Sequence, residues 1–212
     1  SMGGMILLGA LQRFPRDDIA AGVTIGSPTI IAEPPSAPMQ LLVRFEGVAA
    51  ALNDVFSLGF VSCGGALTAH LLPNPIDVGY FNVANTDRSL LFLMNRSVYE
   101  DVSHGVLADL AAMVRDRRWT SADRSFDYSA NLAAVKAPML FVCGRADAVA
   151  PPEAVRHAFD RIGSAEKKLF IAPADAAGNE FGHCDLVLGR TAAARTWPVM
   201  TDWLKRHGTR RG

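Results

Sequence analysis

The amino-acid sequence predicts an α/β fold, in which a parallel sheet is flanked by helices and interrupted by a mainly helical insertion. Residues 19–25 form a short, mostly apolar run closed by a Gly-Ser-Pro turn, which is typical of a buried parallel strand. Strand and helix patterns alternate over residues 139–208, as expected for a parallel sheet covered by helices. Residues 34–134 show helical periodicity but no convincing series of strands, so they predict an insertion.

The N-terminal part predicts a helix followed by a strand. Residues 5–11 are apolar almost all round, which predicts a buried helix that ends near Phe14 and Pro15. After the strand at residues 19–25, a proline-rich stretch at residues 33–38 breaks regular structure.

One helix of the insertion is predicted from helical spacing, with Ser103 as its N-cap. Its apolar positions lie at offsets 0, 3, 4 and 7 and are Leu107, Leu110, Ala111 and Val114.

The C-terminal part predicts strand, helix, strand and helix. Residues 139–143 form a strand stopped by Gly144, and residues 169–172 form another, ended by a proline. The helix between them begins at a Pro-Pro pair, and Gly163 is its predicted C-cap. The last helix ends just before Gly208. The apolar face predicted for it consists of Trp197, Met200 and Leu204.

The predicted elements divide the chain into two parts. Residues 1–33 and 135–212 form an α/β core, and residues 34–134 form a cap inserted between its halves. The chain has 212 residues, of which 50% are hydrophobic, and this is sufficient for one sizeable core.

Charge and hydropathy exclude several classes of protein. The 21 basic and 21 acidic residues balance, so the basic excess typical of nucleic-acid binders is missing. No apolar run reaches the roughly 18–20 residues of a membrane span. The chain starts without the charged region of a signal peptide, and we expect a cytoplasmic location.

The three cysteines are Cys63, Cys143 and Cys184. They are few, odd in number and widely spaced, which argues against a disulfide framework and against a zinc site. We therefore expect reduced, mostly buried thiols, and neither a metal nor another cofactor.

Three residues have the types and positions that nucleophilic catalysis requires. Ser1 directly precedes a predicted helix, Asp147 follows one predicted strand, and His183 lies in the loop after the last strand. A serine hydroxyl needs an adjacent base, an imidazole can take its proton, and a carboxylate can orient that imidazole. The carboxyl ends of parallel strands lie at one edge of the sheet, where such side chains meet. The backbone N–H of Met2 would then face a developing oxyanion.

The segments around these residues resemble the α/β-hydrolase superfamily. Residues 1–5 (Ser-Met-Gly-Gly-Met) are similar to the second half of its nucleophile elbow, in which the serine sits in a Gly-x-Ser-x-Gly-Gly turn. Gly144 and Asp147 followed by Pro151 resemble its acid-strand motif, and residues 182–189 resemble its histidine loop. The resemblance covers about residues 1–31 and 131–212 and is nearest to lipase- and esterase-like members with a helical cap.

The resemblance implies a serine hydrolase of carboxylic esters that works through an acyl-enzyme, with Ser1 as nucleophile, His183 as base and Asp147 as orienting acid. It needs no cofactor, and the apolar cap suggests a small-molecule ester with an apolar acyl group. Acyl transfer to an alcohol or thiol by the same fold is the alternative. The elbow is cut at the nucleophile, so the preceding strands and the second oxyanion donor are expected to be missing.

This truncation implies that the chain is a fragment or a non-catalytic subunit, and that its open sheet edge promotes self-association. We therefore expect the isolated chain to show little esterase activity, because losing one oxyanion donor typically costs about 10²–10³ in rate.

Each candidate residue also has another interpretation. Ser1 followed by Met2 is what a cloning tag leaves behind, and a serine with a free α-amine is also the nucleophile of the N-terminal-nucleophile hydrolases. Asp147 fits a turn that caps the next helix, with Asp175 and Asp185 as rival acids; Asp185 is expected to organise the histidine loop locally.

Cys184 suggests thiol chemistry, but no feature in the sequence lowers its pKa. The remaining histidines are interpreted as structural or solvated; they are His70, His104, His157 and His207.

Overall fold

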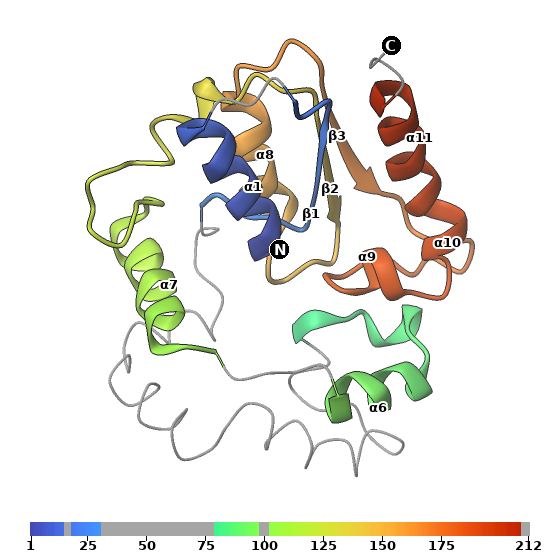
Figure 1. Cartoon of the computed structure of the whole chain (residues 1–212). Helices are drawn as coiled ribbons and strands as arrows, with labels where there is room; N and C mark the ends of the chain where they lie inside the picture. Colours follow the sequence, from blue (N-terminus) through green and yellow to red (C-terminus); the bar gives the residue numbers. More distant parts are fainter. Residues whose placement is uncertain (15–17, 31–78, 98–101, 209–212) are drawn as a thin grey trace.

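The computed structural model describes residues 1–14, 18–30, 79–97 and 102–208, and its centre is a three-stranded parallel sheet (Figure 1). The strands are β1 (Gly22–Ile25), β2 (Met139–Gly144) and β3 (Lys167–Ala172), in the order β1-β2-β3. Both pairings are parallel, with Gly22 opposite Met139 and Met139 opposite Lys167. The predicted α/β class and its parallel sheet are therefore confirmed.

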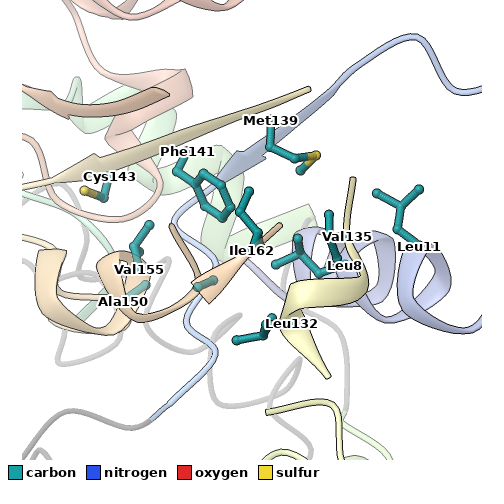
Figure 2. Close-up of a cluster of buried hydrophobic side chains, with 11 residues drawn as sticks. Leu8, Leu11, Leu132, Val135, Met139, Phe141, Cys143, Ala150, Val155 and Ile162 are labelled. Carbon is teal, nitrogen blue, oxygen red and sulfur yellow. The ribbon is translucent and has the colours of Figure 1, made fainter. Parts of the chain in front are cut away.

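Helices cover the two faces of this sheet. On one face, α1 (Met2–Arg13) and α8 (Pro152–Arg161) pack against alternate side chains of β2, Met139, Phe141 and Cys143 (Figure 2). On the other face, α11 (Trp197–Gly208) packs against the intervening residues of β2. All six residues of β2 are buried, which explains why that strand is a continuous apolar run rather than an alternating one.

The described part of the insertion is mainly helical. It contains η1 (Val83–Asn85), α6 (Arg88–Ser97) and α7 (His104–Asp116), and η2 (Leu132–Ala134) leads back to β2. Ser103 caps α7 as predicted, because its hydroxyl accepts the Val106 N–H at 3.4 Å. Residues 31–78, which include Cys63 and His70, lie outside the described residues. The domain boundaries at residues 34 and 134 therefore stay predictions.

The predicted apolar face of the last helix is correct at Met200, which packs against the core, and wrong at its other two positions. Trp197 and Leu204 are 46% and 48% exposed, whereas Trp203 and His207 are 4% and 2% exposed. The His207 ring lies 4.3 Å from the Trp203 ring, and its Nδ1–H donates to the Trp203 carbonyl at 2.8 Å. A polar residue that satisfies its donor within the helix can be buried, and this hid the true face from a prediction based on apolar spacing.

Gly163 is not the C-cap of α8, because the helix ends at Arg161 and its C-cap is Ile162 in extended conformation. Its role is a close approach, because a Cβ there would lie 2.2 Å from the Ala133 carbonyl oxygen. No helix in the described part of the chain has both the length and the apolar composition that crossing a membrane requires.

Candidate active site

The loop after β2 holds the carboxylate of Asp147, which is 2% exposed. Its Oδ1 accepts the N–H groups of Val149 at 2.9 Å and Ala150 at 2.7 Å, which fixes the orientation of the carboxylate. Its Oδ2 lies 2.8 Å from Nδ1 of His183. Asp147 therefore both organises the turn before α8 and contacts the predicted base.

His183 reaches Asp147 because its loop crosses the end of β2. The Ala146 N–H donates to the Phe181 carbonyl at 2.9 Å, and a Cβ on Gly144 would lie 2.2 Å from that same carbonyl oxygen. With Asp147 ionised, Nδ1 of His183 carries the proton and donates it, so Nε2 retains the lone pair that a general base needs. The imidazole is 8% exposed, which limits competition from water for its hydrogen bond.

Gly26, directly after β1, lies against the same pair of side chains. Its φ is +53°, and a Cβ there would lie 2.8 Å from Cε1 of His183 and 3.1 Å from Oδ2 of Asp147. The carboxyl ends of β1 and β2 and the loop after β3 thus converge at this point.

Ser1 lies at this edge of the sheet, as the N-cap of α1. Its amine donates to the carbonyl of Ile25, the residue before Gly26. Burial lowers the pKa of this amine, and the charge of the Asp147 carboxylate opposes that shift. Among the described residues, no hydrogen bond joins the Ser1 hydroxyl to His183, so only His183 and Asp147 of the three predicted catalytic residues are in contact.

A cavity of about 500 Å³ opens beside Ser1. Its walls come from α1, from Tyr80 and from α7 with the turn after it. The apolar side chains nearest in sequence to Ser1 that line it are Met2, Met5 and Ile6. Met2 is the first residue of α1, so its backbone N–H belongs to the helix end, where such groups have no partner within the helix.

The rival acids lie elsewhere. Asp175 accepts hydrogen bonds from Ala177 and Asn179 within its own turn, and the alternative of Asp175 as orienting acid is therefore wrong. Asp185 is fully buried and binds the Gly182 N–H, so its predicted role in organising the histidine loop is confirmed.

Burial, with a further contribution from the charges of Asp185 and Asp147, raises the pKa of Cys184 to about 11. A thiol with that pKa is protonated at neutral pH, which argues against thiol chemistry at this position. The described residues contain no group of three or more His, Cys, Asp or Glu side chains placed to hold a metal ion.

The remaining described histidines lie outside the site. Nδ1 of His157 lies 3.1 Å from the Thr29 hydroxyl, His104 is the exposed first residue of α7, and His207 packs in the core.

Tyr80 was missed by the sequence analysis. Its ring meets the His183 imidazole edge-on, with the ring centroids 5.9 Å apart. Tyr80 belongs to the insertion, more than 100 residues before His183 in the sequence, and no local pattern marks it.

Comparison with known proteins gives structural neighbours only. No protein-family model and no curated protein matches the chain. The monoacylglycerol lipase of Paleococcus ferrophilus is 18% identical with a TM-score of 0.59, over 98% of this chain and 66% of that one. A thermophilic esterase from Thermogutta terrifontis is 18% identical with a TM-score of 0.62, and the match covers 99% of this chain and 64% of the esterase. The enol-lactonase of Burkholderia xenovorans LB400 is 20% identical with a TM-score of 0.55, over 97% and 63%. The chain thus spans slightly less than two thirds of the length of these structures.

Proposed function

Since the chain has the fold of the α/β-hydrolases, we propose that it carries the nucleophile, base and acid of a serine hydrolase that cleaves carboxylic esters. Ser1 is the nucleophile, His183 the general base and Asp147 the group that orients the base. The observation that carries this proposal is the buried 2.8 Å hydrogen bond between His183 and Asp147 at the edge of the sheet where Ser1 lies.

In the first half of the reaction, the Ser1 oxygen bonds to the ester carbonyl carbon while Nε2 of His183 takes the hydroxyl proton. The carbonyl electron pair moves to its oxygen, which becomes an oxyanion. When that pair returns, the bond to the alcohol oxygen breaks and the imidazolium gives its proton to the departing alcohol. The product on the protein is an acyl ester of Ser1.

In the second half, water attacks the acyl carbon and His183 takes the water proton. Collapse of the second oxyanion breaks the bond to Ser1, and the proton returns to the serine oxygen as the carboxylic acid leaves. Asp147 stays ionised throughout and stabilises the imidazolium in both halves.

The N-terminus of α1 supplies the electrostatic stabilisation available within the described residues. The Met2 N–H has no partner within the helix, and the positive end of the helix dipole points the same way. An oxyanion formed on the carbon bound to Ser1 would accept a hydrogen bond from this group.

The cavity favours an ester with an apolar acyl group. Met2, Met5 and Ile6 line it along α1, and Val106 and Met113 line it along α7. Such a surface gains free energy by desolvating a hydrocarbon chain. Arg115, Arg118 and Arg124 also line the cavity and add charged groups on the side of α7 and the turn after it.

The test is covalent labelling with a fluorophosphonate, which forms a stable phosphonyl ester with an activated serine and needs no turnover. It is run on this chain and on the longest open reading frame that contains it, and peptides are mapped by mass spectrometry. We expect the adduct on Ser1, its loss in His183→Gln and its retention in His104→Gln, which removes an exposed histidine outside the site. Hydrolysis of nitrophenyl esters in the same samples then measures the second half of the reaction.

Absence of an adduct on Ser1 from both proteins would sink the assignment of the nucleophile. It would leave the non-catalytic subunit as the better account of this chain. An adduct on Cys184 would instead require a thiol mechanism.

A further inference from the structure

The carboxylate of Asp185 is the most completely buried acidic group beside the candidate site, with no measurable exposure. It begins the short helix α9 (Asp185–Leu188). Its Oδ2 accepts the Gly182 N–H and the Asn85 side-chain N–H, each at 2.9 Å, and its Oδ1 accepts the Asn82 N–H at 3.2 Å. All three partners are neutral N–H donors, and hydrogen bonds to an ionised acceptor are among the strong ones.

These donors come from two segments that are far apart in the sequence. Gly182 directly precedes His183, whereas Asn82 and Asn85 belong to residues 80–86 of the insertion. Figure 1 shows this part of the insertion lying next to α9. Asp185 therefore joins the histidine loop to the insertion through one side chain.

Further hydrogen bonds hold the same two segments together on both sides of His183. The Cys184 N–H donates to the Tyr80 carbonyl at 2.8 Å, and the Asn82 side chain donates to the Glu180 carbonyl at 2.6 Å. Arg190 adds donors to the Thr86 carbonyl at 2.9 Å and the Ala84 carbonyl at 3.1 Å. Residues 80–86 thus contact the loop before, at and after the base.

The docked segment also places an aromatic ring against the base. Tyr80 is anchored by the bond from the Cys184 N–H, and its ring meets the His183 imidazole edge-on. It lines the cavity together with Ser1. The position of the imidazole is therefore fixed on one side by Asp147 and on the other by a segment that depends on Asp185.

We propose that Asp185 is a positioning residue for His183, acting by docking residues 80–86 of the insertion onto the histidine loop. This inference rests on the proposed function for its catalytic consequence, although the docking itself does not depend on catalysis. Loss of the docking frees Tyr80 and the backbone on both sides of His183, so the imidazole loses its fixed orientation.

An aspartate fits this position because every partner is an N–H donor and both of its oxygens accept. Asparagine has the same shape but only one accepting oxygen, so its NH₂ group would face either Asn82 or the Gly182 and Asn85 donors. Asp185→Asn therefore breaks at least one side of the docking while preserving volume. Asn85→Ala removes the side-chain bond from Asn85 to Asp185, together with the 3.4 Å bond from the Thr191 hydroxyl, and leaves the Gly182 and Asn82 bonds in place.

Asp175 provides a matched control within the same long loop. It also accepts three N–H donors, from Ala177, Asn179 and the Asn179 side chain, but all of them lie in its own turn. Asp175→Asn disturbs a hydrogen-bonded carboxylate of the same kind without touching residues 80–86.

The experiment compares the chain with its Asp185→Asn, Asn85→Ala and Asp175→Asn variants by two readouts. Proton NMR follows solvent exchange of the His183 Nδ1 proton and of the Cys184 amide, and fluorophosphonate labelling gives the rate of modification of Ser1. We expect faster exchange of both protons in Asp185→Asn and Asn85→Ala. Labelling should slow by about 10–100-fold, as expected when a catalytic group is misplaced by about 1 Å. Asp175→Asn should leave both readouts near those of the parent chain.

A folded Asp185→Asn or Asn85→Ala variant with parent-like exchange of the His183 proton would overturn the proposal. So would faster exchange accompanied by an unchanged labelling rate. If Asp185→Asn does not fold, Asn85→Ala decides between the same outcomes. If the parent chain does not label at Ser1, the proposed function fails, and the exchange of the His183 proton still decides whether Asp185 positions it.

Discussion

Replacing Gly26 by alanine tests whether the end of β1 supports the acid–base pair. The change has two separable effects. At φ +53° an L-residue occupies the left-handed region, which costs roughly 1–2 kcal/mol. The new Cβ would also lie 2.8 Å from Cε1 and 2.9 Å from Nδ1 of His183, which is closer than real Cβ contacts allow.

Gly178→Ala isolates the first effect. Gly178 has φ +84°, and a Cβ there would meet nothing within 4 Å. Both variants therefore incur backbone strain, but only Gly26→Ala displaces the imidazole or the carboxylate. The two variants therefore share the backbone strain, and only Gly26→Ala adds a contact with His183 and Asp147.

The measurements are urea unfolding and the rate of fluorophosphonate labelling at Ser1. We expect Gly178→Ala to lose about 1–2 kcal/mol, or roughly 2–8 °C in Tm for a chain of this size. Gly26→Ala should lose more, because its Cβ also overpacks a buried site. Labelling should slow by about 100-fold in Gly26→Ala, because an imidazole moved by about 1 Å no longer aligns with the serine hydroxyl. Gly178→Ala should label at the rate of the parent chain. Equal labelling rates in the two variants would refute the close contact of Gly26 with His183 and Asp147.

Three further predictions concern Asp147, the two tryptophans of α11 and Cys184. Asp147→Asn should keep the fold but slow Ser1 labelling by up to about 10⁴-fold, because the amide stabilises the wrong imidazole tautomer; an unchanged rate would exclude Asp147 as the orienting acid. Trp203→Ala should destabilise the chain by about 3–5 kcal/mol and Trp197→Ala by much less, since the first side chain is 4% and the second 46% exposed; urea unfolding distinguishes them, and the reverse order would contradict the observed packing of α11. Because the pKa of Cys184 is raised to about 11, its alkylation by iodoacetamide should rise about ten-fold per pH unit from pH 7 to 10. A rate that levels off above about pH 9 would show an ordinary thiol.

The contact between the proposed acid and the proposed base was predictable, because each residue lies in a local pattern beside a strand. Asp147 follows the glycine that stops β2, and His183 sits in a glycine-flanked loop after β3. Parallel strands deliver both to one edge of the sheet, so the sheet class alone brings two distant positions together. The 2.8 Å contact between them is the structural consequence of that topology.

The contribution of the insertion was not predictable in the same way. Asn85 and Asp185 are 100 positions apart, and each alone resembles an ordinary loop residue. A polar side chain gives no sign in the sequence of which distant group will satisfy it. The same reason hid the burial of His207 in α11.

The site also shows why stability and rate should respond differently to substitution here. The imidazole of His183 is held by close contacts with the backbone. Gly144 lies against the Phe181 carbonyl of the histidine loop, and Gly26 lies against the imidazole itself. Such contacts leave no space through which a small displacement could be absorbed before it reaches His183. A change near the loop that costs only about 1–2 kcal/mol of folding free energy, a typical value for single substitutions, is therefore expected to alter the orientation of the imidazole. Because labelling of Ser1 depends on that orientation, its rate should fall well before the fold is lost, and this separation is what the Gly26 and Gly178 pair measures.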